Sequence, residues 1–197
     1  MLDLDGVLVR GRAGDGTLWT TDLEKDLGIS AAALQNLFFR PYWDGIVTGK
    51  LGLVACLERC LSNIAPGVSA CELIAYWFSR DAHVDRELLE RIDRLRARGA
   101  PVYLATNQEH LRIRYVLQEL GIGRHIDGCF HSAALGFAKP APAFYDSVRA
   151  RVGIEARQLL LIDDNIENTR AALAAGWRAI QWRGDPAVLD HLEAHSI

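Results

Sequence analysis

Two aspartates near the start of the chain have the spacing of a reactive carboxylate pair. Asp3 and Asp5 stand two residues apart, between apolar residues and directly before Gly6. Side chains of an extended strand alternate between its faces, so both carboxylates would project from the same side. Two like charges this close repel, and a divalent cation is the usual compensation. The pair therefore predicts metal-assisted chemistry at the end of a strand.

Three later groups of polar residues are expected to complete this site. They are Thr106-Asn107, Lys139-Pro140 and Asp163-Asp164. An apolar run that ends in two adjacent aspartates is costly unless the charges have partners or a function. Each group alone has an ordinary explanation, because the aspartates could cap the next helix and Lys139 could lie on the surface. Their order along one edge of one predicted sheet favours a shared site.

The elements that must position these residues alternate between strand and helix. After the short segment at Asp3, the strands are predicted at residues 101–105, 128–131, 158–162 and 178–182. The helices are predicted at residues 86–97, 109–120, 142–152, 168–175 and 186–195. This alternation predicts an α/β fold with a doubly wound, Rossmann-like parallel sheet. Function in such sheets collects at the carboxyl ends of the strands, which is where the polar groups fall.

The segment between the first motif and the second predicted strand is helical in pattern. Residues 15–83 contain no obvious strand. Capping boxes are predicted to begin at Thr21 and Ser69, Ser30 is predicted to cap a helix over 31–39, and Pro41 is expected to break that helix. We therefore predict a small helical domain at 15–83, inserted into an α/β core domain made of 1–14 and 84–197.

The first strand is short for a buried strand. Only Met1 and Leu2 precede Asp3, whereas strands usually run about five residues. We expect either a minimal strand held by its neighbours at 101–105 and 158–162, or a true start upstream of Met1.

Composition argues against several classes of protein. The chain has 197 residues and a net charge of -3, so no broad positive field would attract nucleic acid. It contains no long apolar run and no signal-peptide pattern, so we expect a cytoplasmic protein without membrane contact. We expect it to be a monomer or a homodimer. The four cysteines form no C-x-x-C pair, which favours buried free thiols over a zinc site or disulfides.

Four motifs together resemble the haloacid dehalogenase superfamily. They are Asp-Leu-Asp-Gly-Val-Leu at 3–8, Ala-Thr-Asn at 105–107, Ala-Lys-Pro at 138–140 and Leu-Ile-Asp-Asp-Asn at 161–165. The adjacent aspartates are similar to the subfamily whose last motif is a neighbouring acidic pair. The resemblance implies a strand order of 5-4-1-2-3 and a helical cap inserted after strand 1.

The resemblance also implies roles for the motif residues. Asp3 would attack phosphorus as a nucleophile, and Asp5 would protonate the leaving alcohol and then deprotonate water. Thr106, Asn107 and Lys139 would bind the substrate phosphate. Mg²⁺ would bind Asp3, Asp164 and the backbone carbonyl of Asp5, while Asp163 would hold a metal-bound water or orient Lys139.

These roles imply a magnesium-dependent phosphohydrolase that cleaves a small phosphorylated metabolite. Asp5 argues for phosphoester chemistry, because the dehalogenases that gave the superfamily its name resemble this pattern but lack the second aspartate. A sugar phosphomutase of the β-phosphoglucomutase kind uses the same motifs and stays an alternative. A non-catalytic domain that binds phosphometabolites is the alternative from another class. Candidates for substrate specificity are Arg12, Arg40, Trp43 and His110. The two arginines are favoured because buried arginines without a partner are rare.

Overall fold

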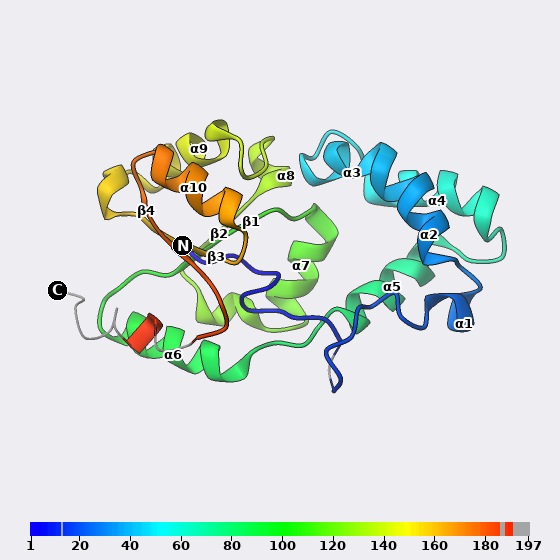
Figure 1. The fold of residues 1–197 in the computed structure, drawn as a ribbon, viewed down its shortest axis with the longest axis horizontal. Helices are drawn as coiled ribbons and strands as arrows, with labels where there is room; N and C mark the ends of the chain where they lie inside the picture. The colour runs from blue at the N-terminus through cyan, green and yellow to red at the C-terminus, as the bar shows by residue number, and fades with distance from the viewer. Residues whose placement is uncertain (13, 186–187, 191–197) are drawn as a thin grey trace.

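The chain folds into an α/β lobe and a helical lobe (Figure 1). The computed structural model describes residues 1–12, 14–185 and 188–190. As predicted, the α/β lobe is of Rossmann type and its strands run parallel. The strands are β1 Tyr103–Thr106, β2 Gly128–His131, β3 Leu160–Asp163 and β4 Arg178–Gln181.

The start of the chain joins two pairs of strands. β1 pairs with β2, and β3 pairs with β4. Leu2 forms parallel bridges to Leu104 of β1 and Ile162 of β3. The amide of Asp3 donates to the Ile162 carbonyl at 2.9 Å, and the amide of Ala105 donates to the Leu2 carbonyl at 2.8 Å. The expectation that neighbouring strands hold this minimal segment is confirmed, although it forms isolated bridges and not a full strand.

Helices cover both faces of the sheet (Figure 1). Alternate strand residues face opposite cores, since Leu104 and Ile162 pack in one apolar cluster while Ala105 and Leu161 pack in another. The first cluster includes side chains of α6 Arg86–Ala97 and α7 His110–Gln118. The second includes side chains of α9 Pro142–Val152 and α10 Ile166–Ala174. This alternation is what a doubly wound sheet requires.

The helical lobe has an apolar core of its own. Its elements are α1 Leu23–Leu27, α2 Ala31–Leu34, the π-helix η1 Gln35–Phe39, α3 Arg40–Val47, α4 Leu53–Ile64 and α5 Ala70–Arg80. Buried residues from these elements form one cluster, and Leu111 and Tyr115 of α7 pack against it. The linkers that join the lobes pair with each other, because Val9 forms an antiparallel bridge to Val84.

The local signals of the helical lobe had mixed outcomes. Ser30 and Ser69 cap α2 and α5 as predicted, each accepting a backbone N–H. The capping box at Thr21 was wrong, because the Thr21 hydroxyl donates back to the Leu18 carbonyl. The prediction that Pro41 breaks the helix was also wrong. Pro41 is the second residue of α3, which continues directly from the π-helical turn η1, and the change of hydrogen-bond register at the end of a π-helical turn accommodates a residue without an N–H.

The remaining elements are short. They are η2 Ile122–His125, α8 Ser132–Leu135 and η3 Ala156–Gln158. Most of the last helix predicted over 186–195 lies outside the described residues. All four cysteines are free, and Cys56 and Cys60 are buried, but Cys71 is exposed and Cys129 half-buried, so the prediction of buried thiols was wrong for these two. Within the described ranges, none of the helices is long and apolar enough to cross a membrane.

Candidate active site

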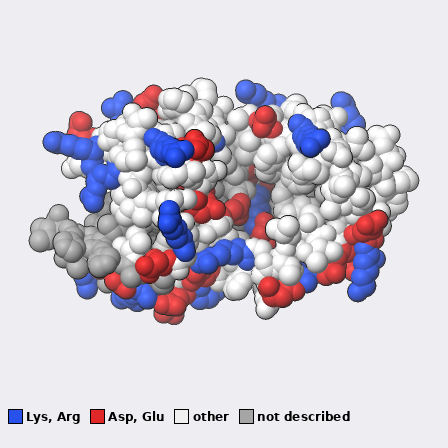
Figure 2. Space-filling model, in the orientation of Figure 1, with Lys and Arg blue, Asp and Glu red and all other residues white. Residues whose placement is uncertain are grey.

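The polar ends of the central strands meet in a hollow between the lobes. Figure 2 shows acidic side chains at the floor of this hollow. A cavity of about 300 Å³ is lined by Asp3, Asp5, Gly6, Thr106, Asn107, Asp164, Asn165 and Asn168. Residues that lie more than 150 positions apart in the sequence thus share one cavity, because parallel strands end at the same edge of a sheet.

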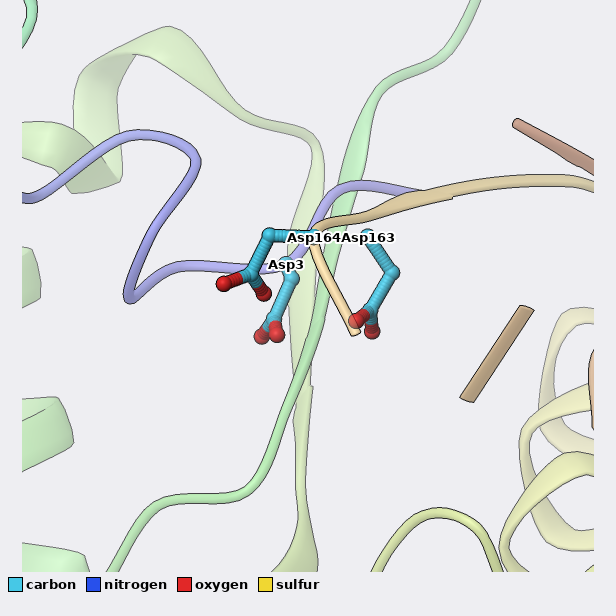
Figure 3. A group of neighbouring side chains, drawn as sticks. All are labelled: Asp3, Asp163 and Asp164. Atoms are coloured by element: carbon cyan, nitrogen blue, oxygen red, sulfur yellow. The ribbon is translucent and has the colours of Figure 1, made fainter. Parts of the chain in front are cut away.

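Three carboxylates converge beside this cavity. Oxygens of Asp3, Asp163 and Asp164 all lie within 4.8 Å of one another, and the carboxyl groups reach the same side of the backbone (Figure 3). Asp3 and Asp163 are buried. Hard carboxylate oxygens gathered at this spacing are the ligands that Mg²⁺ prefers. The donor set therefore fits the metal that the motifs imply.

Lys139 lies between two of these carboxylates. Its Nζ is 3.0 Å from Asp3 Oδ1 and 2.5 Å from Asp163 Oδ2, and its side chain is wholly buried. Burial raises the pKa of Asp3, whereas the adjacent ammonium group opposes the rise. Lys139 thus favours the ionised form of Asp3, which is the form a nucleophile requires.

The two adjacent aspartates have different surroundings. Asp163 accepts hydrogen bonds from Lys139, from the Asn168 amide and from the Asn165 backbone N–H. Asp164 is exposed, and its carboxylate lies against Gly6. Partial withdrawal of its carboxylate from water and the charge of the neighbouring Asp163 raise the pKa of Asp164. Protein donors therefore occupy Asp163, while Asp164 is accessible from the cavity.

The Asn107 side chain fixes the backbone that carries Lys139. Asn107 Nδ2 donates to the Lys139 carbonyl and Asn107 Oδ1 accepts from the Lys139 amide, each at 2.8 Å. The peptide bond between Lys139 and Pro140 is cis. Thr106, at the end of β1, is buried beside the cavity. The Asn107 side chain thus positions Lys139. Only the backbone of Asn107 is then free to bind an anion.

Asp5 lines the same cavity. It is open to the cavity, and Gln108 Nε2 donates to its Oδ2 at 2.5 Å. The pKa of Asp5 is raised to about 7, chiefly because the surrounding protein withdraws it from bulk water. Arg112 opposes this rise, and Asp81 and Asp3 add to it. At neutral pH Asp5 therefore has access to both protonation states, as a proton carrier needs.

This arrangement has a counterpart among known proteins. The family profile of haloacid dehalogenase-like hydrolases matches residues 1–176. The chain belongs to the haloacid dehalogenase-like hydrolases. The resemblance of its four motifs to that superfamily is thereby confirmed.

Individual proteins also resemble this chain. A sesquiterpene phosphatase of Aspergillus oryzae is 26% identical over 166 residues, which cover 82% of each chain. A phosphoglycolate phosphatase of Pectobacterium atrosepticum is 29% identical over 94 residues, 48% of this chain and 40% of the relative. The crystal structure of a family enzyme from Bacteroides thetaiotaomicron, in complex with magnesium and inorganic phosphate, superposes with a TM-score of 0.76 at 19% identity and covers 93% of both chains.

Gly6 lets the hydrolase bring its first turn close to Asp164. It has a φ of +79°, and a Cβ atom there would overlap the Asp164 carboxylate. We expect Gly6→Ala to destabilise the fold by about 1–2 kcal/mol because of its left-handed backbone, and to lower activity further by displacing Asp164. Urea unfolding and phosphate release measure the two effects.

A second glycine provides the control for Gly6→Ala. Gly153 has a φ of +74° with no atom within 4 Å of its would-be Cβ. Gly153→Ala should share the backbone cost and keep the activity. Full activity in Gly6→Ala would show that the close approach to Asp164 is unimportant.

The residues predicted for substrate specificity lie in varied surroundings. Arg12 was predicted as a buried lone arginine, but it forms ion pairs with Asp15 and Asp22. Arg40 was also predicted to be buried, but it is exposed. Trp43 is half-buried and packs in the helical-lobe cluster, with its ring 5.4 Å from that of Phe39.

Among the predicted specificity residues, His110 is the nearest in sequence to a motif, three residues after Asn107. It begins α7, and its Nδ1 is 3.2 Å from His131 Nε2 at the end of β2. Burial and the neighbouring His110 lower the pKa of His131 to about 4.

Several polar residues that contact the site were missed from sequence. Asn168 binds Asp163 and Gln108 binds Asp5. The position of Asn168, in the first turn after the paired aspartates, was a usable signal, because such a turn faces back toward the strand end. No sequence pattern pointed to Arg112 or Asp81, whose proximity to Asp5 depends on contacts between the lobes.

Proposed function

We propose that this chain is a magnesium-dependent phosphohydrolase that cleaves a small organic phosphate monoester through an aspartyl-phosphate intermediate. The observation that carries the proposal is the convergence of Asp3, Asp5, Lys139 and Asp164 at one cavity floor. Asp5 supports phosphoester chemistry in particular, because it adds a proton carrier to the nucleophile.

In the first step Asp3 attacks phosphorus. One carboxylate oxygen of Asp3 forms a bond to phosphorus as the bond to the leaving alcohol oxygen breaks, and Asp5 donates its proton to that oxygen. Lys139, the Thr106 hydroxyl and the backbone N–H groups near Asn107 stabilise the charge on the equatorial oxygens.

In the second step water attacks the phosphorus of the aspartyl-phosphate. Asp5, now a carboxylate, accepts a proton from this water, and the bond between Asp3 and phosphorus breaks. Free phosphate leaves, and both carboxyl groups return to their starting states. The raised pKa of Asp5 supports this alternation, because neither protonation state is costly near neutral pH.

Asp3, Asp164 and the backbone carbonyl of Asp5 would hold Mg²⁺. When bound, the metal supplies positive charge that screens the carboxylates from each other and from the substrate phosphate. Asp163 is assigned to orienting Lys139, because its oxygens already accept hydrogen bonds from protein donors. The likeness to the Bacteroides enzyme is one of fold, so these carboxylates are the main argument for the metal.

We further propose that the helical lobe, residues 15–83, is a cap on a core of 1–14 and 84–197. Its separate apolar cluster and the paired linkers support this division. A cap of this kind would cover the cavity and exclude bulk water. The bridges of Leu2 to β1 and β3 support the strand order 5-4-1-2-3, in which strand 1 is the segment at Leu2 and strands 2 to 5 are β1 to β4. The curated relatives, both named as phosphatases, support the reaction class.

The metal requirement is tested by removal and restoration. Protein treated with EDTA is assayed for phosphate release across sugar, nucleotide, small-acid and terpenyl phosphates, with and without added Mg²⁺. We expect release from at least one class, lower by about 100-fold or more without metal, because the metal contributes several kcal/mol of charge stabilisation. A folded protein that binds phosphates but releases none would favour a binding domain. Conversion of a sugar 1-phosphate to a 6-phosphate without phosphate release would favour a mutase.

A further inference from the structure

Gln108 lies outside the four motifs and contacts the proposed proton carrier. Its side chain is buried, and its Nε2 donates to Asp5 Oδ2 at 2.5 Å. The backbone carbonyl of Gln108 accepts hydrogen bonds from the Ala133 amide at 3.2 Å and from the Ser132 hydroxyl at 3.3 Å. Both ends of this residue are therefore held, one by Asp5 and the other by α8.

The helix that follows Gln108 is anchored to the other lobe. The Glu109 side chain accepts from the backbone N–H groups of Leu111 and Arg112. The Arg112 guanidinium is buried and donates to the carbonyls of Phe78 and Asp81, at the end of α5. A buried arginine with fixed acceptors leaves little freedom to the turn that carries Gln108.

The hydrogen bond also assigns the two oxygens of Asp5. An amide NH₂ group only donates, so the oxygen that faces it, Oδ2, is an acceptor. When Asp5 is protonated, its proton therefore resides on Oδ1. Rotation about the last side-chain bond of an aspartate is otherwise soft, so this donor fixes which oxygen exchanges the proton.

We propose that Gln108 is a positioning residue that holds the Asp5 carboxyl group in the orientation for proton transfer. The inference rests on the proposed role of Asp5. Gln108 itself takes no part in bond formation. The proton moves from Asp5 Oδ1 to the leaving oxygen as the bond between that oxygen and phosphorus breaks.

Substrates with different leaving groups test this role. An alkyl phosphate needs a proton on its leaving oxygen, whereas a dinitrophenyl phosphate does not, since dinitrophenolate is stable as an anion. Gln108→Leu should lower kcat for the alkyl phosphate by about 10- to 100-fold, within the range of general acid catalysis. Release of the first equivalent of dinitrophenol should change by less than about threefold, and KM for both substrates should stay close to the wild-type value.

A matched control lies on the same helix. Gln118 is exposed at the far end of α7, and Gln118→Leu should behave as wild type with both substrates. Thermal unfolding of each variant is measured first. If Gln108→Leu does not fold, Gln108→Met, which keeps an unbranched side chain without the donor, should give the same dependence on the leaving group.

Asp5→Asn separates failure of this inference from failure of the proposed function. Loss of alkyl phosphate turnover in Asp5→Asn, with wild-type turnover in folded Gln108→Leu, would overturn the positioning role alone. An equal loss in the rate at which the first equivalent of alcohol and of dinitrophenol is released by Gln108→Leu would also overturn it, because the effect would not pass through proton transfer to the leaving group. Wild-type turnover in Asp5→Asn would overturn the proton transfer by Asp5 on which the inference rests, and absence of phosphate release by the wild type with every substrate would overturn the proposed function itself.

Discussion

Asp3→Asn is expected to lower kcat by about 10⁴-fold or more, because it removes the nucleophile and not merely a stabilising contact. Asparagine has the shape of aspartate and can still accept the hydrogen bond that the Leu4 amide gives to Asp3 Oδ1 at 2.8 Å. Its amide has no charge and does not attack phosphorus. Phosphate release from an aryl phosphate, measured in saturating Mg²⁺, gives the comparison.

The fold should survive this substitution. Asp3 is buried and its pKa is raised by that burial, so an uncharged residue removes a desolvation cost. Asp146→Asn is the control, because Asp146 is an exposed residue of α9 that does not line the cavity, and it should keep full activity. Retention of wild-type turnover by a folded Asp3→Asn protein would exclude Asp3 as the nucleophile.

Lys139→Met is expected to impair both stability and activity. The substitution leaves Asp3 and Asp163 without the ammonium group that separates them. Removal of one partner from a buried ionic cluster typically costs about 3–5 kcal/mol, which denaturant unfolding at neutral pH measures. Activity should fall by about 10²- to 10³-fold, because a charge that stabilises the transition state is lost.

A double variant separates these two effects of Lys139. Lys139→Met with Asp163→Asn removes one of the two uncompensated carboxylates, so most of the lost stability should return. The activity should not return, because the substrate phosphate still lacks its lysine. If both variants unfold as the wild type does, Lys139 does not compensate these carboxylates in solution.

The site could be predicted largely because the fold obeys two simple periodicities. Strand residues alternate between faces, and parallel strands end at one edge, so Asp3, Thr106 and Asp163 were expected in one place. Apolar spacing also predicted β2, α6 and α9 with the bounds that the structure shows. The pattern of apolar residues was sufficient to predict the bounds of these elements, because their conformation is decided by neighbouring residues in the sequence.

The rest could not be predicted because it depends on contacts and backbone geometry that apolar spacing does not reveal. Arg112 is buried against the end of α5, about thirty residues earlier in the chain. An arginine within a helical pattern is normally predicted to be exposed, so sequence alone did not indicate this burial. Pro41 follows a π-helical turn, which has no recognisable signal in apolar spacing. Arg12 was expected to be buried and unpaired, because apolar spacing gives no indication that Asp15 and Asp22 would pair with it.

The central claim is that Asp3 forms a covalent bond to phosphorus. The stereochemical course of the reaction tests it most directly, with a phosphate monoester made chiral at phosphorus by oxygen isotopes and transferred to an acceptor alcohol in place of water. Two successive in-line displacements, first by Asp3 and then by the acceptor, predict retention of configuration at phosphorus. Inversion would mean a single direct displacement and would contradict the aspartyl-phosphate.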